Sequence, residues 1–113
     1  MVLNKRAPAT RFALAMELLR SGDYERGWQA YEARYEVPNS GSSKPILPFA
    51  EWRGEDLTDK KILVWPEQGL GDKIMFARYL PMLCGEVTVL CEPALVRLFR
   101  ENFNVNVIAA SGP

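Results

Sequence analysis

The sequence of 113 residues contains no histidine and only two cysteines. The absence of histidine removes the commonest general base and the commonest metal ligand from any active site. Cys84 and Cys91 lack a Cys-x-x-Cys spacing, so we expect no metal site and no disulfide framework. We expect both thiols to be reduced and to lie in the core of a cytoplasmic protein.

The chain also lacks an excess of either charge, because 14 Lys and Arg residues balance 14 Asp and Glu residues. Nucleic-acid-binding domains usually carry a basic excess, so we expect no nucleic-acid partner. No apolar stretch approaches the roughly 20 residues that span a bilayer, and the N-terminus has no apolar signal-peptide core. We therefore expect no membrane span.

Residues 1–36 have the pattern of a helical hairpin. Apolar residues recur at helical spacing from Pro8 onwards, until residues 21–23 interrupt the pattern with a glycine suited to a helix end. Aromatic residues then recur every three or four positions between Tyr24 and Tyr35. This pattern predicts two antiparallel helices with one apolar, aromatic face.

Residues 37–59 are rich in proline and serine, which predicts a linker without helix. Residues 60–113 then alternate between two kinds of apolar pattern. We predict strands over 61–65, 86–91 and 104–108, and helices over 72–83 and 93–101. This order, with short connections, predicts a parallel β-α-β-α-β sheet. The expected fold class is α/β, with a helical hairpin followed by a partial Rossmann-like unit.

The glycine-containing loop before the residue 72–83 helix is the candidate site for chemistry. Glycines between a strand and a helix let backbone N–H groups approach a phosphate, a carboxylate or a hydroxyl. A Walker A loop is excluded because Asp72 follows Gly71, and a nucleophile elbow is excluded because Leu70 stands between the glycines. A dinucleotide fingerprint stays open as a minor alternative, with Ile74 in place of its third glycine and Glu92 as the ribose-binding acid.

The loop and the hairpin together resemble bacterial tetratricopeptide-repeat glycosyltransferases of the heptosyltransferase-like family nine. In the loop, Gly71 and Asp72 open a helix and Pro81 lies near its end. Residues 48–54 resemble the family's short Pro-x-Trp-x-Gly lead-in, lengthened by insertion. In the hairpin the matching positions are Gly22, Tyr24, Gly27, Trp28, Tyr31 and Glu32. The hairpin departs from the repeat where Arg34 replaces a small residue and Asn39 replaces the closing proline.

The resemblance implies a two-domain GT-B architecture, of which this chain is the N-terminal, acceptor-side region. The reaction would use a nucleotide-sugar donor and a glycan or protein acceptor, with no other cofactor. Asp72 corresponds to the catalytic base. The expected substrate-binding residues are Glu67, Gln68, Gly69, Gly71 and Lys73. Because residues for a donor domain are lacking, we expect the chain alone to be catalytically incomplete.

Plainer interpretations stay open for the same residues. Asp72 is also suited to capping a helix N-terminus, and Lys73 to lying solvated on the first helical turn. The hairpin is alternatively a non-enzymatic module for binding a protein partner. An unfinished parallel sheet would also leave an open edge strand, through which the chain could associate with itself.

Overall fold

The computed structural model describes residues 7–110 and has a mixed α/β fold. The chain divides into two compact units, one ending at Leu47 and the other beginning at Pro48. Between residues 37 and 60 the chain forms only turns, bends and extended segments. Within the described residues, every helix is too short or too polar to cross a membrane.

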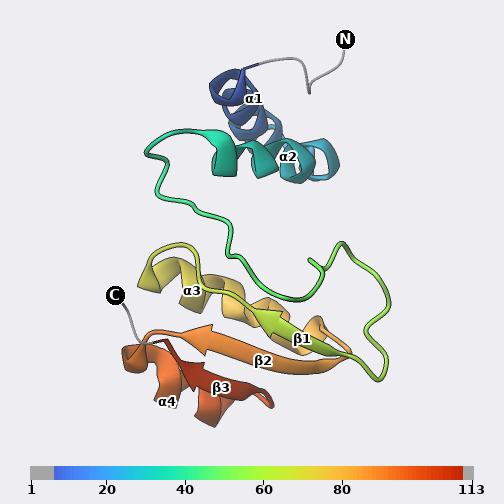
Figure 1. The fold of residues 1–113 in the computed structure, drawn as a ribbon, viewed down its shortest axis with the longest axis vertical. Helices are drawn as coiled ribbons and strands as arrows, with labels where there is room; N and C mark the ends of the chain where they lie inside the picture. The colour runs from blue at the N-terminus through green and yellow to red at the C-terminus, as the bar shows by residue number, and fades with distance from the viewer. Residues whose placement is uncertain (1–6, 111–113) are drawn as a thin grey trace. The chain divides into compact units, whose positions relative to one another are not determined.

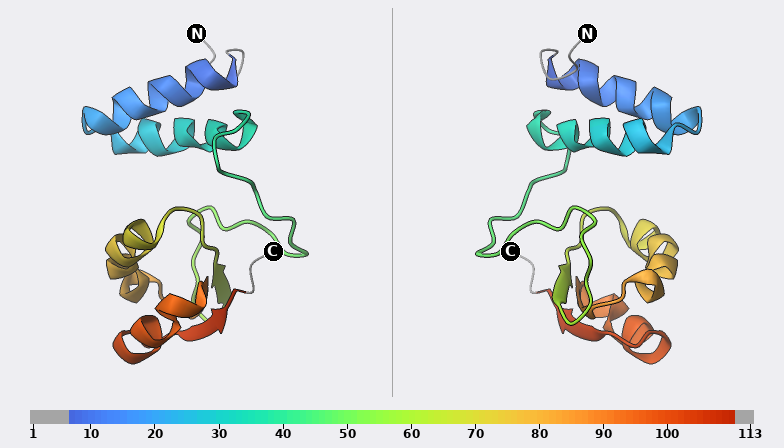
Figure 2. Two further views of the ribbon diagram at one scale, coloured as in Figure 1. Left: turned by 90° about the vertical axis from the view of Figure 1, so that its left-hand side faces the viewer. Right: turned by 90° about the vertical axis from the view of Figure 1, so that its right-hand side faces the viewer.

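The first unit contains a helical hairpin, formed by α1 (Pro8–Arg20) and α2 (Tyr24–Tyr31). The two helices lie side by side and run in opposite directions (Figure 2). Gly22 makes the turn possible because its φ of 90° is one that glycine adopts without strain. The Asp23 side chain then caps α2 by accepting a hydrogen bond from the Arg26 backbone N–H at 3.3 Å.

Close packing between α1 and α2 depends on a small residue at position 27. Gly27 is buried, and a Cβ atom there would lie 2.7 Å from Leu19 Cδ2. A short 3-10 helix, η2 (Glu32–Glu36), continues α2 and buries Ala33. The second predicted helix is therefore divided, with α-helical geometry ending at Tyr31.

The second unit is a three-stranded parallel sheet with helices between its strands (Figure 1). Its elements are β1 (Lys61–Val64), α3 (Leu70–Phe76), the 3-10 helix η3 (Ala77–Met82), β2 (Glu86–Cys91), α4 (Pro93–Asn102) and β3 (Asn106–Ala109). The strand order is β1-β2-β3, with Ile62 opposite Val87 and Val89 opposite Val107. The predicted parallel sheet is confirmed.

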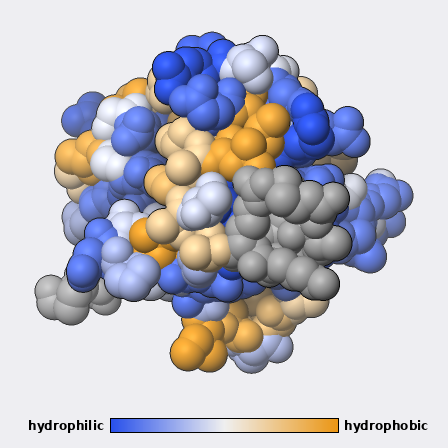
Figure 3. All heavy atoms as spheres, turned by 90° about the horizontal axis from the view of Figure 1, so that it is seen from above, coloured by the Kyte–Doolittle hydropathy of each residue, from blue (hydrophilic) through white to orange (hydrophobic). Residues whose placement is uncertain are grey.

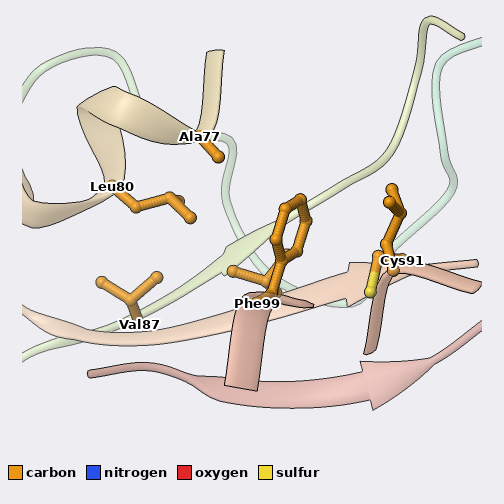
Figure 4. Close-up of a cluster of buried hydrophobic side chains, with 7 residues drawn as sticks. Ala77, Leu80, Val87, Cys91 and Phe99 are labelled. Carbon is orange, nitrogen blue, oxygen red and sulfur yellow. The ribbon is translucent and has the colours of Figure 1, made fainter. Parts of the chain in front are cut away.

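The core of this unit lies between the sheet and the helices, which cover the same face of it (Figure 2). Strand β2 buries alternate residues, because successive side chains of a strand point to opposite faces. The buried cluster comprises Ala77, Leu80, Val87, Val89, Cys91, Leu95 and Phe99. In the close-up, Leu80 points towards Val87, and the Phe99 ring stands between η3 and β2 (Figure 4).

The predicted 72–83 helix differs from the structure at both ends. Its α-helical part begins earlier, at Leu70, because Gly69 takes the N-cap position. It also ends earlier, at Phe76, and continues as η3, which contains Pro81. Proline has no N–H and its ring clashes with the carbonyl four residues before it, so α-helical geometry is disfavoured there.

The outer strands each pair on one side only, because the sheet order places β2 in the middle. Ile108 on β3 is more than half exposed. Self-association through these edges stays a prediction.

Gly85 provides a test of packing at the start of β2. A Cβ atom there would lie 2.7 Å from the Lys60 carbonyl oxygen, which accepts the Glu86 N–H at 2.8 Å. We expect Gly85→Ala to cost about 1–3 kcal/mol of unfolding free energy, the usual cost of overpacking. Urea titration followed by the β2 amide NMR signals would measure the loss in this unit alone.

Gly71→Ala is the matched control, because a Cβ atom at Gly71 would meet no atom within 4 Å. Alanine also favours the helix, so this variant is expected to be neutral or slightly stabilising. Equal effects of the two substitutions would contradict the packing argument.

Candidate ligand-binding site

A pocket of about 200 Å³ opens at the carboxyl ends of β1 and β2. Its wall is apolar, with Val64, Val89, Leu80, Phe76 and Phe99 among the lining residues. Its polar lining comes from the chain that follows β1: Trp65, Glu67, Gln68, Asp72 and Lys73. Carboxyl ends of parallel strands are where α/β sheets commonly bind ligands.

The turn from β1 into α3 positions Asp72. Gly69 is the N-cap of α3, and its carbonyl accepts the Lys73 N–H at 3.1 Å, which closes the first turn. Asp72 Oδ2 would lie 3.5 Å from a Cβ atom at Gly69, so the carboxylate turns back over the start of the helix. Nevertheless, no side chain caps α3, and no residue in the described part hydrogen-bonds to the Asp72 carboxylate. The helix-capping interpretation of Asp72 is therefore wrong.

Lys73 forms an ion pair that joins α3 to the end of β2. Its Nζ donates a hydrogen bond to Glu92 Oε1, and its side chain is 16% exposed. The solvated-lysine interpretation is therefore wrong. The other carboxylate oxygen, Glu92 Oε2, is buried and has no hydrogen-bond partner among the residues the structure describes.

The structure brings four of the six predicted site residues together. Glu67, Gln68, Asp72 and Lys73 line the pocket, and Gln68 Nε2 donates a hydrogen bond to Glu67 Oε2 at 3.2 Å. The other two, Gly69 and Gly71, are exposed and lie outside the lining. Gly69 instead acts in the turn, where it is the N-cap of α3.

Trp65 and Cys91 are pocket residues that the sequence analysis did not identify. Each stands at the carboxyl end of a predicted strand, and that position is a usable signal for a site in a parallel sheet. Glu92 was considered only as a ribose-binding acid, whereas in the structure it pairs with Lys73.

The two cysteines lie in different environments. Cys91 is 1% exposed, as expected, but Cys84 is exposed, so its predicted place in the core is wrong. Cys84 lies in the turn before β2, where no strand pairing or helix covers it. Burial raises the pKa of the Cys91 thiol, and the Glu92 carboxylate raises it further, against the opposing effects of Lys73 and Arg100.

This difference predicts unequal thiol reactivity. The reactive species is the thiolate, so the raised pKa and the burial of Cys91 both slow its modification. At pH 8, we expect a disulfide reagent to label Cys91 in a Cys84→Ser variant at least about tenfold more slowly than Cys84 in a Cys91→Ser variant. Absorbance of the released thiolate measures both rates, and equal rates would contradict the buried position of Cys91.

The same pKa shift predicts a dependence of stability on pH. The folded state binds the Cys91 proton more tightly than the unfolded state does. This contribution to stability is therefore fully present below the ordinary thiol pKa. It is lost as the pH rises through the raised pKa of the folded state. Cys91→Ser should remove this part of the loss of unfolding free energy at alkaline pH, while Cys84→Ser should leave that loss unchanged.

No family model and no solved structure matches the chain. The chain is similar to Protein FlbA of Caulobacter vibrioides, with 36% identity over 99 residues. The matched region is 82% of this chain but 17% of FlbA, so the chain spans about a sixth of that relative.

These comparisons overturn the resemblance to tetratricopeptide-repeat glycosyltransferases of family nine, because none of them points to a glycosyltransferase or to a tetratricopeptide protein. The motif residues have local structural reasons that are not specific to one family. Gly22 provides a positive φ and Gly27 a close helix contact, while Gly69 caps a short helix. The comparisons therefore support a similarity to one part of FlbA.

Proposed function

We propose that the α/β unit forms one wall of a binding site for a small molecule that bears a hydroxyl group. The observation that carries this proposal is the Asp72 carboxylate, which lines an apolar-walled pocket and accepts no hydrogen bond from the described residues. In this proposal, Asp72 accepts a hydrogen bond from the ligand hydroxyl and is placed to take its proton.

The neighbouring polar groups suit the same ligand. Gln68 has an amide that both donates and accepts hydrogen bonds, and Glu67 adds a second carboxylate to the lining. Apolar side chains make up much of the remaining lining and reduce competition from water. Small-molecule sites commonly combine such a wall with a few polar groups that fix the ligand's orientation.

The proposal treats the second unit as Rossmann-like. The parallel order β1-β2-β3, with helical segments after each of the first two strands, supports this description. Transfer of a sugar from a nucleotide donor stays a prediction without family support, so the proposal is limited to binding of the hydroxyl-bearing molecule.

An amide NMR titration of the chain tests this proposal. The probes are glucose, N-acetylglucosamine, 2-phenylethanol and a nucleotide sugar. We expect at least one hydroxyl probe to shift the signals of residues 65–73, and Asp72→Asn to weaken that binding by about tenfold, the usual value of a hydrogen bond to a charged group. Asp59→Asn is the control, because Asp59 is exposed and lies outside the pocket lining. Shifts that survive unchanged in Asp72→Asn would refute the role of Asp72.

A second proposal concerns the hairpin as a protein-binding surface. Tyr24 and Trp28 lie four residues apart on α2, so they share one helix face, and they are 61% and 50% exposed. Exposed aromatic side chains are typical anchors of protein interfaces. The face seen from the top of Figure 1 is largely hydrophilic with smaller hydrophobic patches (Figure 3). Because Tyr and Trp are weakly hydrophilic on the hydropathy scale of that view, these patches do not mark the aromatic pair.

Peptide display against the chain tests the hairpin proposal. We expect selected peptides to lose binding to a Tyr24→Ser, Trp28→Ser double variant and to keep it for Tyr79→Ser, which removes an exposed aromatic ring from the other unit. If selection enriches no peptide that depends on Tyr24 and Trp28, the hairpin proposal fails.

A further inference from the structure

We infer that the ligand of the pocket at the ends of β1 and β2 is an apolar alcohol, and not a sugar. By an apolar alcohol we mean a hydrocarbon about one ring in size that bears a single hydroxyl group. This inference rests on the proposed binding function and names the substrate class of the same site. It follows from the composition of the lining, from the hydrogen bonds that the polar groups already make, and from the volume of the pocket.

Most of the lining consists of hydrocarbon. Eight of its fourteen residues have side chains made only of carbon and hydrogen, so over half of the lining offers a ligand no side-chain hydrogen bond. These side chains come from different elements of the unit: Val64 ends β1, Phe76 ends α3, Leu80 lies in η3, Val89 in β2 and Phe99 in α4. A bound molecule therefore meets apolar surface from both strands and from the helices.

Most polar side chains of the lining are engaged with a neighbouring side chain. Gln68 Nε2 donates a hydrogen bond to Glu67 Oε2 at 3.2 Å. Lys73 Nζ donates a hydrogen bond to Glu92 Oε1, a residue outside the lining. The Asp72 carboxylate, by contrast, accepts no hydrogen bond from the residues that the structure describes. A ligand with one hydroxyl group brings a donor that suits this acceptor.

A sugar fits this lining poorly. Its hydroxyl groups are hydrogen-bonded to water in solution, and each one that loses water without gaining a partner carries a desolvation cost. Several such groups on one ring would face side chains such as Val64, Leu80 and Phe99, which have no donor or acceptor. The hydrocarbon body of an apolar alcohol has no such cost, because burial of apolar surface is favourable.

The volume of the pocket agrees with a ligand of this size. The pocket measures about 200 Å³, and an apolar protein cavity of about 150 Å³ accepts benzene. A six-membered ring with its hydroxyl group can therefore be accommodated. Trp65 and Phe76 line the pocket and are 43% and 48% exposed, so a bound hydrocarbon would cover part of their surface and gain from that burial.

Three probes with the same six-carbon ring test the inference: cyclohexanol, trans-1,2-cyclohexanediol and myo-inositol, which differ in the number of their hydroxyl groups. Amide NMR titration of the whole chain gives their dissociation constants from the signals of residues 65–73 and 89–92. We expect cyclohexanol to bind at least about tenfold more tightly than myo-inositol, with the diol between them, because the added hydroxyl groups find no partner. Asp72→Asn should weaken cyclohexanol, because its hydroxyl group loses a charged acceptor.

Two neighbouring positions on α3 provide matched variants for the apolar contact. Phe76 and Met75 are each 48% exposed, but only Phe76 lines the pocket. We expect Phe76→Ala to weaken cyclohexanol about threefold or more, because the ring surface that the ligand covers is lost. Met75→Ala should leave the dissociation constant unchanged. Equal losses in the two variants would overturn the placement of the hydrocarbon in this pocket.

The outcomes separate this inference from the proposed function. Binding of myo-inositol at least as tight as that of cyclohexanol would overturn the inference and leave the hydroxyl-binding site standing. Cyclohexanol binding that is unchanged in Asp72→Asn would refute the proposed function, and the inference with it, because the hydroxyl group would not be recognised by Asp72. If none of the three probes shifts the pocket signals, both are refuted.

Discussion

The second unit depends on the central strand β2, which is hydrogen-bonded on both sides and buried on one face. Val87, Val89 and Cys91 place their side chains against the helices, and β1 and β3 both take their register from this strand. Its last residue lines the pocket, and the residue after it, Glu92, holds Lys73. The end of β2 therefore contributes both to the apolar wall and to the ion pair of the candidate site.

Helix α3 contains no buried residue, so buried side chains of its own do not hold it in position. The segment is attached to the core through η3, where Ala77 and Leu80 are buried, and through the Lys73–Glu92 ion pair at its other end. Segments with few buried apolar side chains open at lower free energy than the core. The polar side of the pocket is thus carried by a segment with no buried side chain of its own, whereas its apolar wall includes residues of the buried core, among them Leu80, Val89 and Phe99.

The sequence predicts the elements of this unit better than it predicts the site. A run of β-branched residues identifies β2, and the order of elements leads to a parallel sheet. The start of α3 was misplaced because Gly69 and Asp72 are both acceptable N-caps, and only the backbone geometry distinguishes them. The pairing of Lys73 with Glu92 spans 19 positions, so it depends on the register of the completed sheet and not on local pattern. The family resemblance failed for a related reason: short glycine and aromatic motifs report local turns and contacts, which different proteins share.

The ion pair also changes what the glycine loop can bind. Glycines before a helix are typical of anion sites, because exposed N–H groups and the helix dipole attract negative charge. In this chain the helix that follows is short, its nearest ammonium group is neutralised by Glu92, and two carboxylates line the adjoining pocket. A zero net charge for the whole chain says nothing about such a local balance. The side chains around the loop therefore bear on what it can bind as much as its glycines do.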